Sequence, residues 1–246
     1  MTQTLAELAA QLIAAHDGGA LIDAAPANAP TDRAGAYALQ DEIVGQLGAI
    51  GGWKIAAGRG DEPLCSPLPQ NRFFEADAQL DGTKHRFFLG EVEVAVRLAA
   101  DIAPGADRQA VETAISGVHP ALEMIANPFT DRAAMPPNLV LGDLQSNGAI
   151  VIGPAFDDNI RAELGTLEAT LEYDGKPVHS VSEGASWEQT LDALAWLSGH
   201  AHSRGMALKA GQVIITGSRA LLALDGARTV SGSFGKWGRL SSTIVA

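Results

Sequence analysis

The stretch Gly90-Glu-Val-Glu-Val-Ala-Val96 carries the clearest structural signal in this chain of 246 residues. Strict alternation of side-chain type from Glu91 to Leu98 predicts a β-strand. Because successive side chains of a strand point to opposite faces, Glu91 and Glu93 share one face and the valines share the other. The two carboxylates start about 7 Å apart at their Cα atoms. Two acids this close require a cation, a shared proton or bulk water.

A third acid interrupts the apolar run Pro120-Ala-Leu-Glu-Met-Ile125. The run from Val118 to Ile125 predicts another strand, so Glu123 either faces solvent or is buried with a partner. If the two strands meet, the three carboxylates form an oxygen-rich site suited to Mg²⁺ or Mn²⁺ rather than to zinc. The simpler alternative is a solvated strand face on which each acid lies opposite a Lys or Arg. The spacing leaves both open.

Outward from these strands, the periodicity predicts helices over 3–15, from Thr31 or Asp32 to about 47, and over 186–203. A strand is expected over 51–56, and turn signals at Asp81-Gly82 and at 173–176 predict hairpins. Many strands with few, separated helices indicate an α+β fold with a large mixed or rolled sheet. We expect a small helical N-terminal region, 1–50, and a β-roll catalytic domain, 51–246, that form one structural unit.

The composition limits the classes of partner. The chain is 46% hydrophobic and carries a net charge of −12, which disfavours nucleic acid and anionic membranes. Its one cysteine, Cys65, excludes an intrachain disulfide and a C-x-x-C site. The first residues lack the basic and apolar segments of a signal peptide, and no apolar run approaches the ~20 residues of a membrane span. We therefore expect a cytoplasmic protein.

Other chemical motifs are weaker. Lys54, within the apolar segment Trp53-Lys-Ile-Ala56, is a candidate acid/base or anion-binding lysine, although a strand-edge position would equally explain it. The glycine-rich segment 232–238 lacks the G-K-[ST] signature of a phosphate loop. The G-x-S-x-G signature of a nucleophile elbow is absent around Ser218. The sequence therefore offers acid, base and metal chemistry rather than nucleotide binding.

Taken together, these segments resemble the fumarylacetoacetate hydrolase superfamily. The most similar group is the 2-keto-4-pentenoate hydratases and 4-oxalocrotonate decarboxylases of aromatic meta-cleavage pathways. The matching pieces follow the family order along nearly the whole chain: Ala36-Tyr-Ala-Leu-Gln40, Lys54-Ile, Glu91-Val-Glu93, Pro120-Ala-Leu-Glu123, Asp143 with Ser146 ahead of Val151-Ile-Gly153, and Leu208-Lys-Ala-Gly-Gln-Val-Ile-Ile-Thr-Gly217.

The resemblance implies a fumarylacetoacetase-like β-roll that holds Mg²⁺ or Mn²⁺ on Glu91, Glu93 and Glu123. A small 2-oxo acid would chelate this ion. In the same comparison Lys54 matches the active-site lysine and Asp143 a site-proximal aspartate. The loop that lines the substrate pocket corresponds to Thr216, Gly217 and Ser218. The family likeness also implies a homo-oligomer, with pairing to a related family member as a further option.

Three departures from the family pattern concern the surroundings of the metal. Asn71 stands where the hydratases carry an acidic residue used in proton transfer, a role that could move to Glu75 or Asp77. The segment 54–63 is shorter than in the hydratases, and Glu188-Gln-Thr190 replaces a Gly-His-Pro motif. The three candidate metal ligands thus follow the family pattern, whereas residues expected near the substrate depart from it.

The leading hypothesis is a metal-dependent lyase that adds water to a 2-hydroxy-2,4-dienoate through an enolate-type intermediate. Decarboxylation of a 2-oxo-enedioate and C–C hydrolysis of an acylpyruvate remain open. An extra basic residue in the pocket would favour a dicarboxylic substrate, with Arg59 and Arg72 as candidates. The competing hypothesis is a catalytically silent partner subunit, consistent with Asn71 and the missing Gly-His-Pro.

Overall fold

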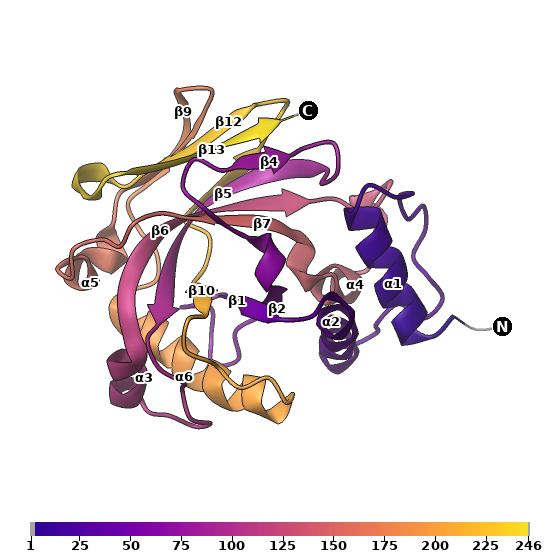
Figure 1. Ribbon diagram of the computed structural model, residues 1–246, viewed down its shortest axis with the longest axis horizontal. Helices are drawn as coiled ribbons and strands as arrows, with labels where there is room; N and C mark the ends of the chain where they lie inside the picture. Colours follow the sequence, from indigo (N-terminus) through magenta and orange to yellow (C-terminus); the bar gives the residue numbers. More distant parts are fainter. Residues whose placement is uncertain (1–2, 246) are drawn as a thin grey trace.

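Two β-sheets pack against each other in the computed structural model, which describes residues 3–245 (Figure 1). The larger sheet has the order β2-β1-β10-β5-β6-β7-β3, and its eighth strand, β11, also pairs with β5. Its strands are β1 (Ile50–Ile55), β2 (Cys65–Pro69), β3 (Phe73–Glu75), β5 (Phe87–Leu98), β6 (Ile115–Ala126), β7 (Asn147–Ile152), β10 (Val213–Ile215) and β11 (Ala220–Ala223). The smaller sheet has the order β4-β13-β12-β8-β9 and consists of β4 (Gln79–Asp81), β8 (Ala169–Tyr173), β9 (Lys176–Val181), β12 (Thr229–Ser233) and β13 (Arg239–Val245).

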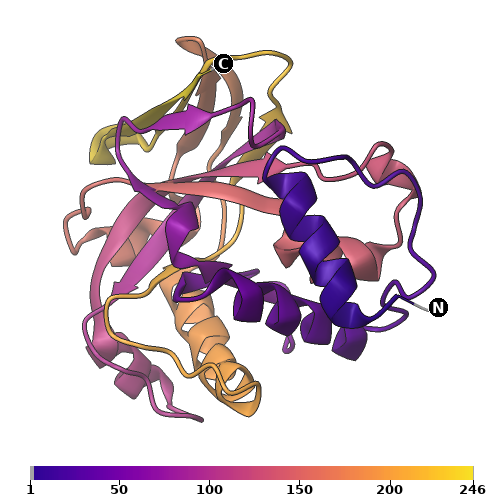
Figure 2. The same cartoon turned by 45° about the vertical axis from the view of Figure 1, so that its right-hand side comes forward.

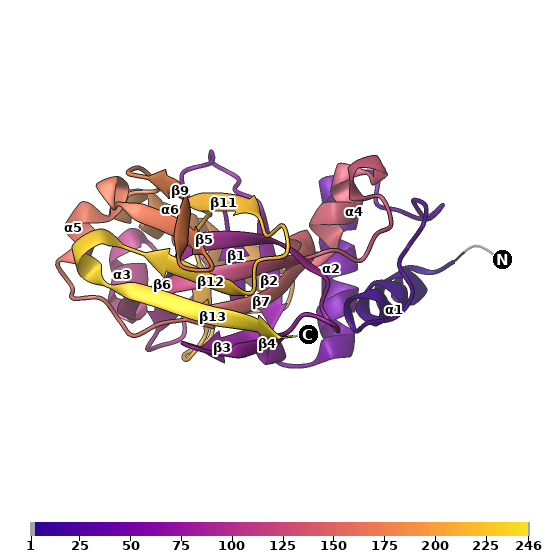
Figure 3. The same cartoon turned by 90° about the horizontal axis from the view of Figure 1, so that it is seen from above.

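Helices surround the larger sheet at both of its ends. They are α1 (Leu5–His16), α2 (Arg33–Leu47), α3 (Arg108–Ala114), α4 (Pro137–Gly142), α5 (Ile160–Glu163) and α6 (Trp187–Ser203). Seen from above, α1, α2 and α4 gather at one end of the molecule, and α3 and α5 lie at the other (Figure 3). Mixed sheets with separate helices confirm the predicted α+β class. Within residues 3–245, no helix combines the length and apolar content required to cross a bilayer.

The antiparallel pair β5 and β6 forms the centre of the molecule, and both strands are longer than the sequence predicted. Their apolar faces, which include Val92 and Leu122, pack against the smaller sheet in one hydrophobic core. The sheets approach closely at Gly232, where an added Cβ would lie 3.3 Å from both side chains. The valine face of the quoted strand is therefore the core face.

The opposite face of the larger sheet is covered by α1, α2 and α4. Leu12 and Leu39 join Ala95 and Ile150 of the sheet in a second hydrophobic core, and Figure 2 shows α1 and α2 side by side. The second helix begins where the sequence indicated, since Asp32 accepts a hydrogen bond from a first-turn amide. The first begins at Leu5, two residues later than predicted, after its N-cap Thr4. The N-terminal helices thus share a core with the β-rich part, and the division at residue 50 stays a prediction.

The two predicted hairpins had different outcomes. The turn at 173–176 is confirmed, since Asp174 and Gly175 take positive φ between the paired strands β8 and β9. The hairpin at Asp81-Gly82 is wrong, because β4 pairs in parallel with β13 while the next strand, β5, lies in the larger sheet. The segment does turn, and Asp81 Oδ1 accepts the main-chain N–H groups of Thr83 and Lys84. The local sequence therefore indicated a turn but not how the strands on either side of it pair.

Candidate active site

The pairing of four strands brings the predicted acids and the lysine onto one face of the larger sheet. Glu91 lies directly opposite Glu123 in the β5–β6 register, and Glu93 follows two residues along β5. Lys54 of β1 pairs with Ile215 of β10, which in turn pairs with a β5 residue on the Glu93 face. Since paired residues share a face, Lys54 points to the same side as the three carboxylates.

The three carboxylates form a compact buried group. One candidate ligand oxygen from each of Glu91, Glu93 and Glu123 lies within 4.8 Å of the others. Glu93 and Glu123 are fully buried, and Glu91 is 7% exposed. Lys54 Nζ lies 2.5 Å from Glu123 Oε2 and 3.9 Å from Glu91 Oε2. One lysine therefore faces three acids, and the alternative of a solvated strand face is wrong.

Burial and mutual repulsion shift the pKa values of this group. Burial raises the pKa of Glu93 well above its usual range, and the charges of Glu91 and Glu123 raise it further. Burial also raises the pKa of Glu123 to about 7, although Lys54 opposes the shift. Burial alone would lower the pKa of Lys54, but Glu123, Glu91 and Glu93 together raise it above its ordinary value. The lysine thus stays protonated, and Glu93 and Glu123 keep their protons to a higher pH than ordinary carboxyl groups unless a cation displaces those protons.

Two carboxylate oxygens in this group have no hydrogen-bond partner in the described part of the chain. They are Glu91 Oε2 and Glu93 Oε1, and both are buried. The other oxygens of Glu93 and Glu123 are held: Gly217 N donates to Glu93 Oε2 at 2.8 Å, and Asn147 Nδ2 donates to Glu123 Oε1 at 2.8 Å. Buried, unpartnered carboxylate oxygens are ligands that Mg²⁺ and Mn²⁺ prefer. The residues present therefore fit a hard divalent cation.

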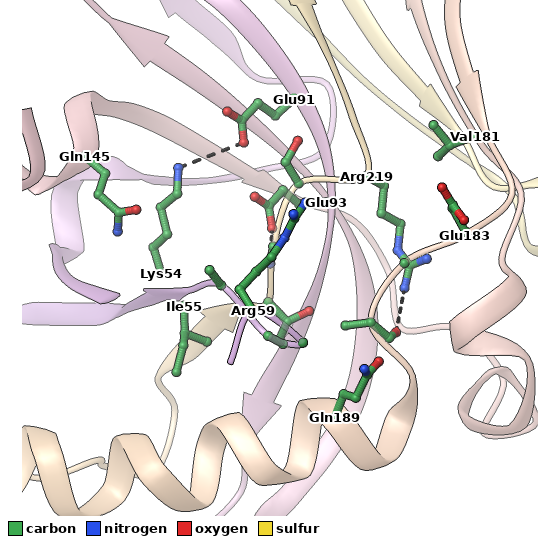
Figure 4. A pocket seen from close by; sticks show the side chains of 18 residues that line it. Lys54, Ile55, Arg59, Glu91, Glu93, Gln145, Val181, Glu183, Gln189 and Arg219 are labelled. Carbon is green, nitrogen blue, oxygen red and sulfur yellow. Dashed lines mark hydrogen bonds and ion pairs between the residues drawn. The ribbon is translucent and has the colours of Figure 1, made fainter. Parts of the chain in front are cut away.

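A cavity of about 550 Å³ adjoins the carboxylates (Figure 4). This volume is within the range of roughly 300–1,000 Å³ typical of small-molecule sites. Its walls come from the β1–β2, β9–α6 and β10–β11 loops, together with residues of β1, β5, β9, α6 and the segment before β7. The lining residues are Lys54, Ile55, Ala56, Ala57, Gly58, Arg59, Glu91, Glu93, Gln145, Val181, Glu183, Gly184, Ala185, Gln189, Thr216, Gly217, Ser218 and Arg219.

The predicted pocket loop, Thr216 to Ser218, lies in this wall. The hydroxyl of Thr216 donates a hydrogen bond to the main-chain oxygen of Val94 at 3.0 Å, and this bond fixes the loop to β5. Gln145 enters the wall from the short helix η3 (Leu144–Ser146), whose three residues all have positive φ. Left-handed conformations cost free energy for residues other than glycine. A strained turn therefore places Gln145 at the cavity.

The other two predicted catalytic residues lie outside the cavity wall. Asp143 is buried and accepts hydrogen bonds from His16 Nε2 at 2.7 Å and Ser146 Oγ at 2.9 Å. Asn71 is exposed on the helical turn η1 (Gln70–Arg72). Glu75 and Asp77, to which its role could have moved, are exposed as well. The structure thus brings together Lys54, the three glutamates and the 216–218 loop, without Asp143 or Asn71.

Sequence reasoning missed several residues of the site. Of the two basic candidates, Arg59 lines the cavity, whereas Arg72 is buried elsewhere and donates to the main-chain oxygen of Asn147. Arg219 was not considered, although it directly follows the predicted pocket loop, and that adjacency was a usable signal. Gln145 and Asn147 carried no signal, since their positions depend on the left-handed turn and the β6–β7 register.

The family model described as fumarylacetoacetate (FAA) hydrolase C-terminal matches residues 74–244, and the chain therefore belongs to the fumarylacetoacetate hydrolase family. Among characterised relatives, it is 31% identical over 133 residues to 2-hydroxyhexa-2,4-dienoate hydratase of Comamonas testosteroni. This match covers 54% of the chain and spans half the length of that hydratase. These findings confirm the resemblance stated from the sequence.

Solved structures share the fold. The 4-oxalocrotonate decarboxylase from Pseudomonas putida G7, complexed with magnesium and adipate, superposes with a TM-score of 0.82 at 22% identity, covering 98% of this chain and 97% of that one. The fumarylpyruvate hydrolase from Pseudomonas aeruginosa, in complex with Mn²⁺ and pyruvate, gives a TM-score of 0.54 at 16% identity, covering 78% and 88%. These likenesses confirm the predicted fumarylacetoacetase-like fold.

Proposed function

We propose that this protein is a divalent-metal-dependent lyase that hydrates a small 2-hydroxydienoic acid through its 2-oxo tautomer. The observation that carries the proposal is the buried group of Glu91, Glu93 and Glu123, with two unpartnered oxygens, beside a cavity of ligand size. The hydratase relative supports hydration, and the metal-bound structures of the fold relatives support Mg²⁺ or Mn²⁺.

In this proposal the three glutamates would hold the metal, and a bound divalent ion would supply the positive charge that polarises a 2-oxo group and stabilises an enolate. Gly217 N and Asn147 Nδ2 each fix one carboxylate oxygen and so orient Glu93 and Glu123. Lys54 is protonated and lines the cavity, where its ammonium can neutralise the substrate carboxylate or supply a proton. Hydration adds a proton and a hydroxyl across a C=C bond, and Lys54 is the proton donor that the geometry offers.

Decarboxylation of a 2-oxo-enedioate is the second candidate, since the decarboxylase superposes over nearly the whole chain. It would use the same metal and Lys54, with loss of CO₂ in place of water addition. Acylpyruvate hydrolysis has less support, because no histidine among residues 3–245 lines the cavity to activate water. Assembly as a homo-oligomer, pairing with a related family member and a cytoplasmic location remain predictions.

An assay with four substrates tests the function. The protein with Mg²⁺ is incubated with 2-hydroxypenta-2,4-dienoate, 2-hydroxyhexa-2,4-dienedioate, 2-oxohex-3-enedioate and an acylpyruvate, and loss of dienol absorbance, CO₂ release and pyruvate release are followed. We expect loss of dienol absorbance that requires the metal and is abolished in Lys54→Met. Arg239→Gln, an exposed change on β13, is the control and keeps the activity. Silence toward every substrate, with metal bound, would favour the partner-subunit hypothesis.

A further inference from the structure

Two arginines line the cavity, and one of them, Arg219, lies on the side away from Lys54. Figure 4 shows Lys54 and Glu91 at one side, Arg219 at the other, and Glu93 with Arg59 between them. Of the three glutamates, only Glu93 influences the pKa of Arg219, which burial lowers to about 10. The cavity thus has an acidic end that fits a metal and a basic end at some distance from it.

The position of Arg219 is fixed by its surroundings. Its main-chain N–H donates to the oxygen of Val92 at 2.9 Å, between the two metal-site glutamates of β5. Its Nη2 donates to the oxygen of Ala185 at 3.2 Å. The guanidinium packs on Gly184, where an added Cβ would lie only 2.3 Å from Nη1. Glycine at this position therefore makes room for a pre-organised guanidinium.

Arg219 has no carboxylate partner within residues 3–245. The chain has 29 acids for 17 bases, so partners are plentiful, and Glu183 lines the same cavity without forming an ion pair with it. Nη1 is buried and unpartnered. A half-buried guanidinium without an anionic partner destabilises the protein, and an anionic ligand that pairs with it offsets this cost. Arg59, exposed on the β1–β2 loop, is likewise unpaired in the described part of the chain.

We propose that Arg219, assisted by Arg59, binds a second carboxylate of the substrate, so that the site prefers dicarboxylic 2-oxo acids. This inference rests on the proposed function, which places the 2-oxo acid end of the substrate at the three glutamates. The planar guanidinium binds a carboxylate through two parallel hydrogen bonds, which lysine cannot do. A dienoate with a second carboxylate can be hydrated as a simple dienoate can, so the preference selects the substrate rather than the reaction.

A structural alternative is that Arg219 only balances the charge of Glu93. In that case its replacement would change Mg²⁺ affinity and would affect mono- and dicarboxylic ligands alike. A specificity role predicts an effect on the dicarboxylic ligand alone. The two roles are therefore separated by a matched pair of ligands.

The experiment is calorimetry in saturating Mg²⁺ with 2-oxoadipate and 2-oxohexanoate, which share six carbons and differ only in a terminal carboxylate or methyl group. We expect the wild type to bind 2-oxoadipate about tenfold or more tightly than 2-oxohexanoate. Arg219→Gln should lose this preference with unchanged 2-oxohexanoate and Mg²⁺ affinity, and Arg59→Gln should lose part of it. Arg239→Gln, which removes one positive charge outside the cavity wall, should keep the preference.

The outcomes distinguish this inference from the function on which it rests. Equal wild-type affinity for the two ligands, or an equal loss of both in Arg219→Gln, overturns the arginine subsite and leaves the proposed function intact. Absence of Mg²⁺-dependent binding of either ligand overturns both. Arg219→Lys keeps the charge without the planar fork and should retain part of the preference, so the subsite can be tested even if Arg219→Gln does not fold.

Discussion

Two buried polar clusters lie on the same side of the larger sheet, and they differ in how far the protein itself satisfies them. The carboxylate centre consists of Lys54, Glu91, Glu93 and Glu123. The aspartate cluster consists of Asp143 with His16, Ser146 and Arg132, whose Nη1 donates to Ser146 Oγ. Both contain charged groups removed from water.

In the aspartate cluster, each carboxylate oxygen of Asp143 accepts a hydrogen bond, whereas Nδ1 of His16 has no partner among the residues that the structure describes. In the carboxylate centre, Glu91 Oε2 and Glu93 Oε1 accept no hydrogen bond from residues 3–245, and both residues line a cavity. Buried acceptors without partners are costly unless something else supplies the donor or the charge. Burial of charge alone therefore does not mark a binding site, whereas unsatisfied oxygens at a cavity do.

Replacement of Asp143 tests whether the aspartate cluster stabilises the fold rather than binding the metal. Asp143→Ala leaves the hydrogen-bonding groups of His16 and Ser146 unpaired in the interior, so we expect the free energy of unfolding to fall by about 3–5 kcal/mol. Mg²⁺ affinity should stay within roughly threefold of the wild type. Chemical denaturation and calorimetry measure both quantities, and Asp143→Asn should be less destabilised than Asp143→Ala. A stable but inactive Asp143→Ala enzyme would instead support a role of Asp143 in the active site, where the family resemblance places an aspartate.

The pH dependence of stability tests whether the buried acids of the carboxylate centre destabilise the metal-free protein when they ionise. Glu93 and Glu123 have folded-state pKa values above the unfolded value of 4.5, with Glu123 at about 7. Such a group binds its proton more tightly in the folded state, so its contribution is full below pH 4.5 and is lost as the pH rises through about 7. We expect the melting temperature of the chelator-treated protein to fall by about 5 °C between pH 5.5 and 8.

This fall should be smaller in Glu123→Gln, which has no carboxyl group to ionise, and Mg²⁺ should reverse it at pH 8 by mass action. Differential scanning fluorimetry with and without Mg²⁺ measures both effects. An identical pH profile in the wild type and Glu123→Gln would mean that the buried acids are not the cause.

Asn147 lies between the two clusters, and its replacement has the smallest expected effect of the changes considered. Its side chain donates to Glu123, and its main-chain oxygen accepts from Arg72, whose pKa both Asp143 and Glu123 influence. We expect Asn147→Ala to lower Mg²⁺ affinity about tenfold, because the orientation of a ligand carboxylate is lost. Asn159→Ala, an exposed position, is the matched control. Unchanged affinity would show that Glu123 needs no support from Asn147.

Features of the site that depend on local geometry could be predicted from the sequence, whereas those that depend on strand register could not. Strand period placed Glu91 and Glu93 on one face, and helix caps such as Asp32 marked element ends correctly, because both depend on local geometry. The pairing of Glu91 with Glu123, and the route from Lys54 through β10 to the same face, depend on register between distant strands. No local pattern encodes that register, and only the family resemblance indicated that these residues share a site.

The same limit explains why the positions of several side chains could not be predicted from the sequence. Asp143 was assigned to the site from its family position, yet its side chain turns toward His16, which lies 127 residues away along the chain. Gln145 enters the cavity through a left-handed turn that residue type does not predict. Arg219 belongs to the cavity because Gly184, on a different loop, leaves room for it.

Metal binding by the three glutamates is the central claim, and calorimetry of Mg²⁺ binding to the wild type and to the double variant Glu93→Gln/Glu123→Gln at pH 8 tests it most directly. We expect one ion bound per chain in the wild type and none in the double variant. The double variant should also melt above the metal-free wild type, because two buried charges are gone. Equal Mg²⁺ binding by the two proteins would contradict this claim.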